Sequence, residues 1–235
     1  MQLNAPHRYR TATEIDAVAE LLDLRGARVL ELGCGAAHTT RALVERLGAA
    51  EVVATEVDRI QHDKNLAITD LPQVRFVLGG AEAIAATDAS FDAVCMFKSL
   101  HHVPVDTMDR ALAEIHRVLK AGGAALFSEP VYWGAFNTLM SLIHDEQSVR
   151  QAAFEALRRA VDAGRFRSEA EVFIEVPGTY PDWASFAGRF LDVTHTELNL
   201  DATRRAEIRT AFEAHMTPTG AHFVKPHRLD LLRKV

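Results

Sequence analysis

The sequence predicts the α/β fold class, with a doubly wound and mostly parallel sheet. Short runs rich in apolar and β-branched residues alternate along the chain with runs of helical periodicity. Neither an internal repeat nor a Pro/Gly-rich linker divides the 235 residues, which predicts a single domain. Strands that alternate with helices of this length favour a parallel sheet covered by helices on both faces.

The clearest elements lie between residues 25 and 130. Buried-strand patterns predict strands at Arg28–Leu32, Glu51–Glu56, Val74–Leu78, Asp92–Phe97 and Ala124–Ser128. Helical periodicity predicts helices at His38–Leu47 and Arg59–Ile68, and a third helix whose apolar stripe runs from Met108 to Leu119. This part of the chain is therefore expected to be a cofactor-binding core.

The pattern changes after Pro130. Residues 131–190 are interpreted as a helical cover over an acceptor site, because they are rich in aromatic residues and contain no convincing strand. Residues 1–24 are expected to form an N-terminal helical segment. The C-terminal part, residues 191–235, is expected to return to the sheet through a strand at Ala221–Val235.

Composition excludes several classes of protein. The formal net charge is −6, which argues against a duplex nucleic acid as partner. No apolar run approaches the ~20 residues that cross a bilayer, the N-terminus lacks the apolar stretch of a signal peptide, and two cysteines fit a reducing compartment. We expect a cytoplasmic monomer or homodimer without a membrane partner.

A glycine loop follows the first expected strand and opens a helix. Gly33 and Gly35 allow the backbone to approach a ligand closely, and the following helix N-terminus offers free N–H groups. Glu56 ends the next strand about twenty residues later, where an acidic side chain can accept hydrogen bonds from ribose hydroxyls. This order of features predicts a site for an adenosine-containing cofactor.

Two residues favour one kind of cofactor. The dinucleotide fingerprint requires a third glycine, and His38 stands there instead. Glu31, two residues before the first glycine, would repel a pyrophosphate but suits a ligand that carries an ammonium and a sulfonium. S-adenosylmethionine is therefore favoured over a nicotinamide cofactor.

The segment Val29-Leu-Glu-Leu-Gly-Cys-Gly35 resembles the first motif of class I S-adenosylmethionine-dependent methyltransferases, in particular the small-molecule, type 11-like branch. Residues 55–58, 79–84, 91–102 and 117–123 resemble further motifs of that family in the right order. The resemblance covers roughly residues 25–130. It implies a Rossmann-like, mostly parallel sheet of seven strands with a helical insertion after the fifth strand.

The resemblance also implies roles for individual residues. Glu31 would lie near the methionine ammonium, Glu56 would bind the ribose, and Val57 would pack on the adenine. Cofactor contacts are further expected from Gly33, Cys34, Gly35, Ala36, Gly80, Ala81, Glu82, Phe97 and Lys98. The family usually has Asp where this chain has Gly80, so a side-chain hydrogen bond to the adenine is not expected here.

The acceptor side is less sharply defined by the sequence. His101 and His102 follow the fourth strand, and we interpret them as a general base or an anchor for the acceptor. Tyr132, Trp133 and His144 are expected to bind the acceptor. The spacing of the eleven histidines is not that of metal ligands, so no metal site is predicted.

The sequence thus predicts an enzyme that methylates a small molecule. A non-catalytic protein that binds S-adenosylmethionine and a nicotinamide-dependent oxidoreductase stay open as alternatives. The identity of the acceptor and the atom that receives the methyl group do not follow from the sequence.

Overall fold

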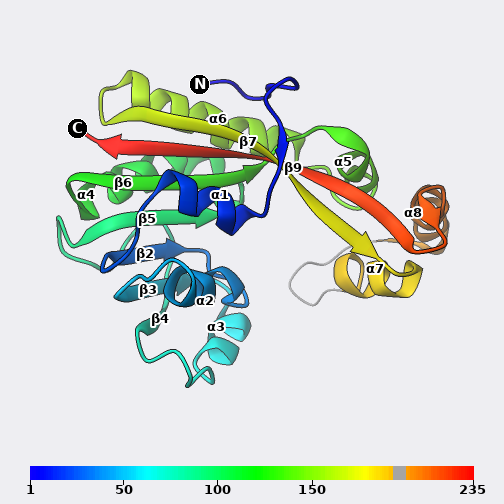
Figure 1. Cartoon of the computed structure of the whole chain (residues 1–235), viewed down its shortest axis with the longest axis horizontal. Helices are drawn as coiled ribbons and strands as arrows, with labels where there is room; N and C mark the ends of the chain where they lie inside the picture. Colours follow the sequence, from blue (N-terminus) through cyan, green and yellow to red (C-terminus); the bar gives the residue numbers. More distant parts are fainter. Residues whose placement is uncertain (193–199) are drawn as a thin grey trace.

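The protein is described by a computed structural model that covers residues 1–192 and 200–235 (Figure 1). The expected C-terminal region therefore contains residues 193–199, which lie outside the described part. The strands are β1 (Arg10–Thr11), β2 (Arg28–Leu32), β3 (Glu51–Glu56), β4 (Val74–Leu78), β5 (Phe91–Phe97), β6 (Leu119–Pro130), β7 (Phe166–Tyr180), β8 (Met216–Thr217) and β9 (Gly220–Lys234).

Helices connect these strands. The α-helices are α1 (Glu14–Leu21), α2 (His38–Glu45), α3 (Arg59–Asn65), α4 (Met108–Val118), α5 (Gly134–Ser141), α6 (Gln147–Asp162), α7 (Trp183–Phe190) and α8 (Ala202–Glu213). Two short 3₁₀ helices, η1 (Leu100–His102) and η2 (Val105–Thr107), lie between β5 and α4. Among the described residues, no helix is both long and apolar enough to cross a membrane.

One sheet contains all the strands. Its order is β1-β7-β9-β6-β5-β2-β3-β4, and β8 pairs with β9. The pairs from β4 to β6 are parallel, whereas β9 runs antiparallel to both β6 and β7. The Rossmann-like, mostly parallel sheet is confirmed, and its seven longer strands are joined by two strands of only two residues each.

Two apolar layers cover the faces of the sheet. On one face, α4 and α6 pack through Leu112, Ile115 and Leu157 against Leu30, Phe127 and other sheet residues. On the other face, α1 and α2 contribute Val18 and Leu43. Both layers are needed because the central strands are buried on both sides, as expected of a parallel sheet.

A third apolar cluster lies beyond the end of the sheet. The ladder between β6 and β9 ends at Pro130 and His227, but the ladder between β7 and β9 continues to Tyr180 and Ala221. This two-stranded extension, together with α5, α7, α8 and β8, forms what we call the cap (Figure 1). Its cluster contains Leu139, Tyr180, Phe186, Leu191, Ile208, Phe212, Ala221 and Phe223.

The expected helical cover of residues 131–190 is wrong in two respects. Residues 166–180 form β7, a strand of fifteen residues that pairs along its length with β9. The helix α6, moreover, packs its apolar face on the core of the sheet, so the segment is not only a cover. The N-terminal segment contains the expected helix, α1, but it also contains β1, which pairs with β7.

Candidate functional site

The glycine loop occupies the carboxyl end of β2, at the centre of the sheet. Gly33 has a φ of 77°, and a Cβ atom there would lie 2.7 Å from the Cβ of Ser99. Ser99 follows β5, and its hydroxyl donates a hydrogen bond to the carbonyl of Leu32 at 2.8 Å. The two strand ends therefore meet at Gly33, and only glycine fits there without displacing the loop after β5.

Glu56, at the end of β3, holds the glycine loop. One carboxylate oxygen accepts a hydrogen bond from the backbone N–H of Gly35 at 2.8 Å. The other oxygen accepts bonds from the backbone N–H groups of Val57 at 2.8 Å and Asp58 at 3.0 Å. This buried carboxylate is thus positioned beside the loop, where its remaining lone pairs can face a ligand.

Glu31, near the end of β2, provides a second buried carboxylate just before the loop. Its side chain accepts a hydrogen bond from the hydroxyl of Thr40, on α2, at 2.5 Å. Burial raises the pKa of Glu31 to about 8, against the opposing effect of the Thr40 hydrogen bond. A cation bound beside Glu31 would favour the ionised form.

Cys34 lies between the two glycines and is buried. Burial raises the pKa of its thiol to about 12, so it is a neutral side chain near neutral pH rather than a nucleophile. The side-chain amide of Asn65 donates a hydrogen bond to the carbonyl of Gly35 at 2.8 Å and lies 3.4 Å from the Cys34 sulfur. Asn65 supports the loop from α3, a role that its position in a polar helix does not suggest.

An apolar edge adjoins the carboxylate of Glu56. Val57 is 69% exposed and Leu78, at the end of β4, is 39% exposed. The expected adenine turn, Gly80-Ala81-Glu82, follows β4 directly. Its alanine is buried, and a Cβ atom at Gly80 would meet the Glu82 carboxylate at 2.5 Å, so glycine lets that side chain fold back over the turn.

The loop after β5 begins at Phe97, which is buried, and Lys98, which has a φ of 54°. The Lys98 ammonium forms an ion pair with Glu14 of α1, and its backbone N–H donates a hydrogen bond to the carbonyl of Ser128. These contacts fix the direction in which the chain enters η1. Ala36, in the glycine loop, is exposed.

His101 and Glu129 form a buried pair at the ends of β5 and β6. The Nδ1 atom of His101 bonds one carboxylate oxygen of Glu129, and the backbone N–H groups of Ser99 and Leu100 donate to the other at 3.2 and 2.9 Å. Burial alone would raise the pKa of Glu129, but His101 and these donors hold it below its ordinary value. Glu129 therefore carries the charge that orients the imidazole ring.

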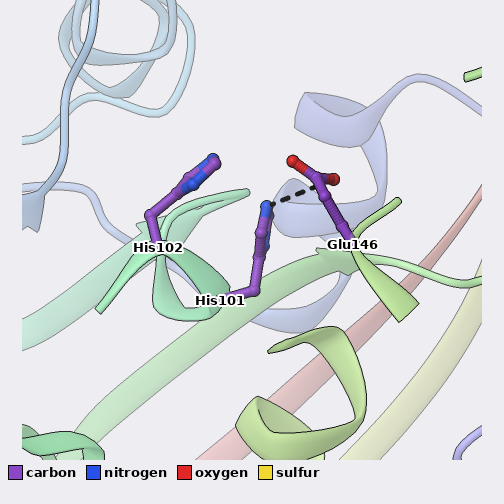
Figure 2. Close-up of side chains that lie close together, drawn as sticks. All are labelled: His101, His102 and Glu146. Carbon is purple, nitrogen blue, oxygen red and sulfur yellow. Dashed lines mark ion pairs between the residues drawn. The ribbon is translucent and has the colours of Figure 1, made fainter. Parts of the chain in front are cut away.

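Figure 2 shows His101 between His102 and Glu146, which lies just before α6. The Nε2 atom of His101 is 3.9 Å from an oxygen of Glu146, and the two histidine rings have their centroids 4.1 Å apart. Arg150 pairs with Glu146 at 2.5 Å. Burial and the neighbouring His101 lower the pKa of His102. Arg150 and His101 lower the pKa of Glu146, against its burial.

The two histidines were predicted from the sequence, whereas Glu129, Glu146 and Arg150 were not. Forty-four positions separate Glu146 from His102, and no spacing rule connects them. A buried acidic residue at the end of an expected strand, as at Glu129, is the signal that could have been used.

The three residues expected to bind the acceptor differ in their exposure and in their contacts. Trp133 is 38% exposed and packs on Tyr9 with ring centroids 5.1 Å apart. Tyr132 is half-buried next to it, whereas His144 is exposed after α5. Tyr9, which the sequence analysis did not single out, also contacts Phe173 of β7 and so ties the N-terminus to this edge.

Comparison with known proteins agrees with this arrangement. Residues 29–123 match the sequence profile of a methyltransferase domain family. An uncharacterized methyltransferase of Mycobacterium tuberculosis is 38% identical over 121 residues, which are 52% of this chain and 47% of that protein. A ubiquinone/menaquinone biosynthesis C-methyltransferase of Legionella pneumophila is 28% identical over 192 residues, 73% of this chain and 74% of that one.

Solved structures share the fold over nearly the whole chain. The YcgJ protein of Bacillus subtilis superposes with a TM-score of 0.68 and 22% identity, covering 94% of this chain and 97% of that one. A geranyl diphosphate methyltransferase in complex with SAM superposes with a TM-score of 0.56 and 16% identity, covering 94% and 84%. The protein is therefore an α/β protein with the fold of class I methyltransferases.

The family match covers the part of the chain that contains the candidate site. The matched segment, residues 29–123, contains the glycine loop and both strand-end carboxylates, so the similarity to a methyltransferase domain extends to the candidate site. The chain spans about half the length of the first curated relatives that it matches.

Proposed function

We propose that this chain transfers a methyl group from S-adenosylmethionine to a small-molecule acceptor, with S-adenosylhomocysteine as the second product. The observation that carries the proposal is the glycine loop at the carboxyl edge of a parallel sheet, with the buried Glu56 bonded to the loop and the buried Glu31 just before it in β2. Ligands of open α/β sheets bind at this edge.

The residues present fit such a cofactor along its length. Glu31 is a buried carboxylate whose pKa is raised, and an ammonium group bound beside it would compensate its negative charge. A Cβ atom built on Gly35 meets nothing within 4 Å, so the loop is open at the position where the ribose would lie against Glu56. Val57 and Leu78 expose an apolar edge that suits a flat aromatic base.

When bound, S-adenosylmethionine supplies a methyl group on an electrophilic sulfonium, so no reactive protein group is required for the transfer itself. The chain positions the reactants. The backbone at Gly33, Gly35 and Lys98 would surround the methionine end of the cofactor. Orientation of two reactants can supply roughly 7–11 kcal/mol of a barrier. The acceptor displaces the sulfur in line, and its new bond to the methyl carbon forms as the carbon–sulfur bond breaks.

The acceptor is proposed to bind beside η1 and the end of β6, which the His101–Glu129 contact brings together. His101 and His102 lie at this position and would anchor the acceptor or take its proton. Tyr132 and Trp133 would supply apolar contact, while His144 is the most exposed of the proposed acceptor residues. The names of the Legionella relative and of the geranyl diphosphate methyltransferase support an acceptor of small size. The net charge of −6 argues against a nucleic acid.

Titration calorimetry tests the cofactor. S-adenosylmethionine and S-adenosylhomocysteine are expected to bind with one site per chain, and NAD is expected not to bind. Tight binding of NAD without a response to S-adenosylmethionine would contradict the proposal. A screen of metabolite fractions with the labelled cofactor, read by the mass gain of one methylene group, then tests for turnover. Binding without any methylated product from any fraction would support a non-catalytic binding protein.

A further inference from the structure

We propose that His101, His102 and Glu146 bind a divalent transition-metal ion at the acceptor end of the site. Among the described residues these are the side chains whose metal-ligating atoms gather, with one atom from each residue within 4.8 Å of the others (Figure 2). Two imidazoles and one carboxylate form a ligand set that suits Zn²⁺, Fe²⁺ or Co²⁺ and leaves coordination positions open.

The orientation of His101 supports the site. Its Nδ1 atom is bonded to Glu129, so the proton of the neutral ring stays on Nδ1 and the lone pair of Nε2 points toward Glu146. A carboxylate that fixes a histidine in this way is the usual outer partner of a metal-bound imidazole. Glu129 is itself held by two backbone N–H groups, so the ring has little freedom to turn.

The separation between His101 and Glu146 is close to that of two ligands on one ion. The Nε2 atom of His101 is 3.9 Å from Glu146 Oε2, too far for a hydrogen bond, and Oε2 is the oxygen that accepts both bonds from Arg150. Two ligands on one tetrahedral ion, with bonds of about 2.1 Å, lie roughly 3.4 Å apart. A bound ion would therefore need to draw this pair together by about 0.5 Å, and any pair of the cluster by at most about 1.4 Å.

The charges around the cluster allow a cation to bind. Glu129 and Glu146 carry two negative charges, and Arg150 compensates one of them through a single Glu146 oxygen. No hydrogen bond within the described residues ends on the other Glu146 oxygen, Oε1, which is thus available as a ligand. Arg228 also acts on Glu129 but pairs with the buried Asp230 at 2.6 Å, so three carboxylates and two arginines lie around the cluster.

The position of the ion would give it a role in the proposed reaction. The ligands come from η1 and from the residue before α6, next to the carboxyl ends of β5 and β6. Open coordination positions there would accept an oxygen atom of the acceptor, and a metal lowers the pKa of a bound hydroxyl. The proton would leave to water before the oxygen attacks the methyl carbon. This part of the inference rests on the proposed function, whereas the ion site does not.

Binding of Co²⁺ to the metal-stripped protein tests the site without any methyl transfer. Titration calorimetry should give one site per chain, and the visible spectrum of the Co²⁺ complex should show bands of nitrogen coordination. His102→Ala and Glu146→Gln are each expected to weaken Co²⁺ binding at least ten-fold, since even outer partners of metal sites contribute ten- to a hundred-fold. S-adenosylmethionine binding and the circular dichroism spectrum report whether each variant is folded.

Two matched controls separate this site from adventitious binding. His7→Ala removes an exposed histidine of the N-terminal segment, and Glu155→Gln removes a carboxylate of α6 that pairs with Arg158 at 2.6 Å as Glu146 pairs with Arg150. Both controls should bind Co²⁺ like the wild type. The proposal is overturned if the wild type shows no saturable site, which would leave the space to a proton shared by His101 and Glu146. It is also overturned if the controls weaken binding as much as His102→Ala and Glu146→Gln do.

Discussion

The cofactor-binding core and the cap are built by different kinds of contact. In the core, the strands from β2 to β6 follow one another at short intervals, and each helix covers the strands next to it. In the cap, α5, α7 and α8 lie on the ends of β7 and β9, which are far apart in the chain (Figure 1). The core repeats one local unit, whereas the cap is an assembly of aromatic side chains from distant segments.

Because of this difference, we expect the core and the cap to have separate functions. The core holds the glycine loop, the two carboxylates and the histidine cluster in a frame packed on both faces. The cap contributes a self-contained apolar cluster whose rings contact one another, such as Phe186 and Phe212 with centroids 4.7 Å apart. A self-contained cluster can open without disturbing the frame, so we expect the cap to influence the acceptor more than the cofactor.

The largest expected effect comes from Gly33→Ala, in the core. The new Cβ atom would lie 2.7 Å from the Ser99 Cβ, which forces apart the ends of β2 and β5. Calorimetry should detect no saturable binding of S-adenosylmethionine. Gly26→Ala is the matched control, because Gly26 has a similar φ of 72° and open space around it. It should destabilise the fold by about 1–2 kcal/mol and leave cofactor binding unchanged. Equal behaviour of the two variants would mean that the clash with Ser99 is unimportant.

Phe212→Ala tests whether the cap unfolds separately. Phe212 is fully buried in the cap cluster, and removal of a buried phenylalanine ring costs about 3–5 kcal/mol. Hydrogen exchange should speed up in α7, α8 and the cap ends of β7 and β9. The central strands and the affinity for S-adenosylmethionine should stay near the wild-type values. Faster exchange throughout β2 to β6 would show that core and cap form one cooperative unit.

Glu56→Ala should reduce the affinity for S-adenosylmethionine about ten- to a hundred-fold. Hydrogen bonds to a charged group contribute about 1.5–3 kcal/mol each, and the variant loses the proposed acceptor for the ribose as well as the bond that holds Gly35. Calorimetry measures the change. Glu51→Ala, at the other end of the same strand and half-buried, is the control. Unchanged affinity in a folded Glu56→Ala protein would remove this carboxylate from the site.

The last prediction concerns the pH dependence of stability. In the folded protein burial raises the pKa of Glu31 to about 8 from its ordinary value of 4.5, so folding takes up a proton between these two values. The contribution of Glu31 to the free energy of unfolding should therefore fall as the pH rises from 5 to 8. Urea unfolding of Glu31→Gln should show a weaker fall over that range. Glu45→Gln, an exposed position on α2, should retain the wild-type dependence.

The core was predictable because its signals are local. The five strands expected between residues 28 and 128 all form, with shifts of a few residues at their ends, because continuous apolar runs bounded by glycine or polar residues specify buried parallel strands. The return of the chain to the sheet near residue 221 is confirmed by β9. Helix ends were less well predicted, as at Arg59–Ile68, which the structure ends at Asn65.

The strand β7 could not be recognised in the same way. Its first half reads Phe166-Arg-Ser-Glu-Ala-Glu171, rich in charged residues of low β propensity, and Pro177 and Gly178 interrupt its second half. What makes it a strand is pairing with β9, whose partner residues lie more than forty positions away at the cap end. Sheet propensity depends on such neighbours more than on the residues themselves.

The residues of the site also fall into two groups, those predicted from the sequence and those that only tertiary contacts bring together. The sequence by itself determined the glycine loop, Glu31 and Glu56, because in a strand–loop–helix unit the residues at the strand ends fall on one edge of the sheet. Only the tertiary structure decided that Ser99 closes on Gly33, that Asn65 supports the loop, and that Glu129 and Glu146 join His101. These contacts join side chains from separate elements. Their partners are selected by sheet order and helix packing, which no short-range pattern encodes.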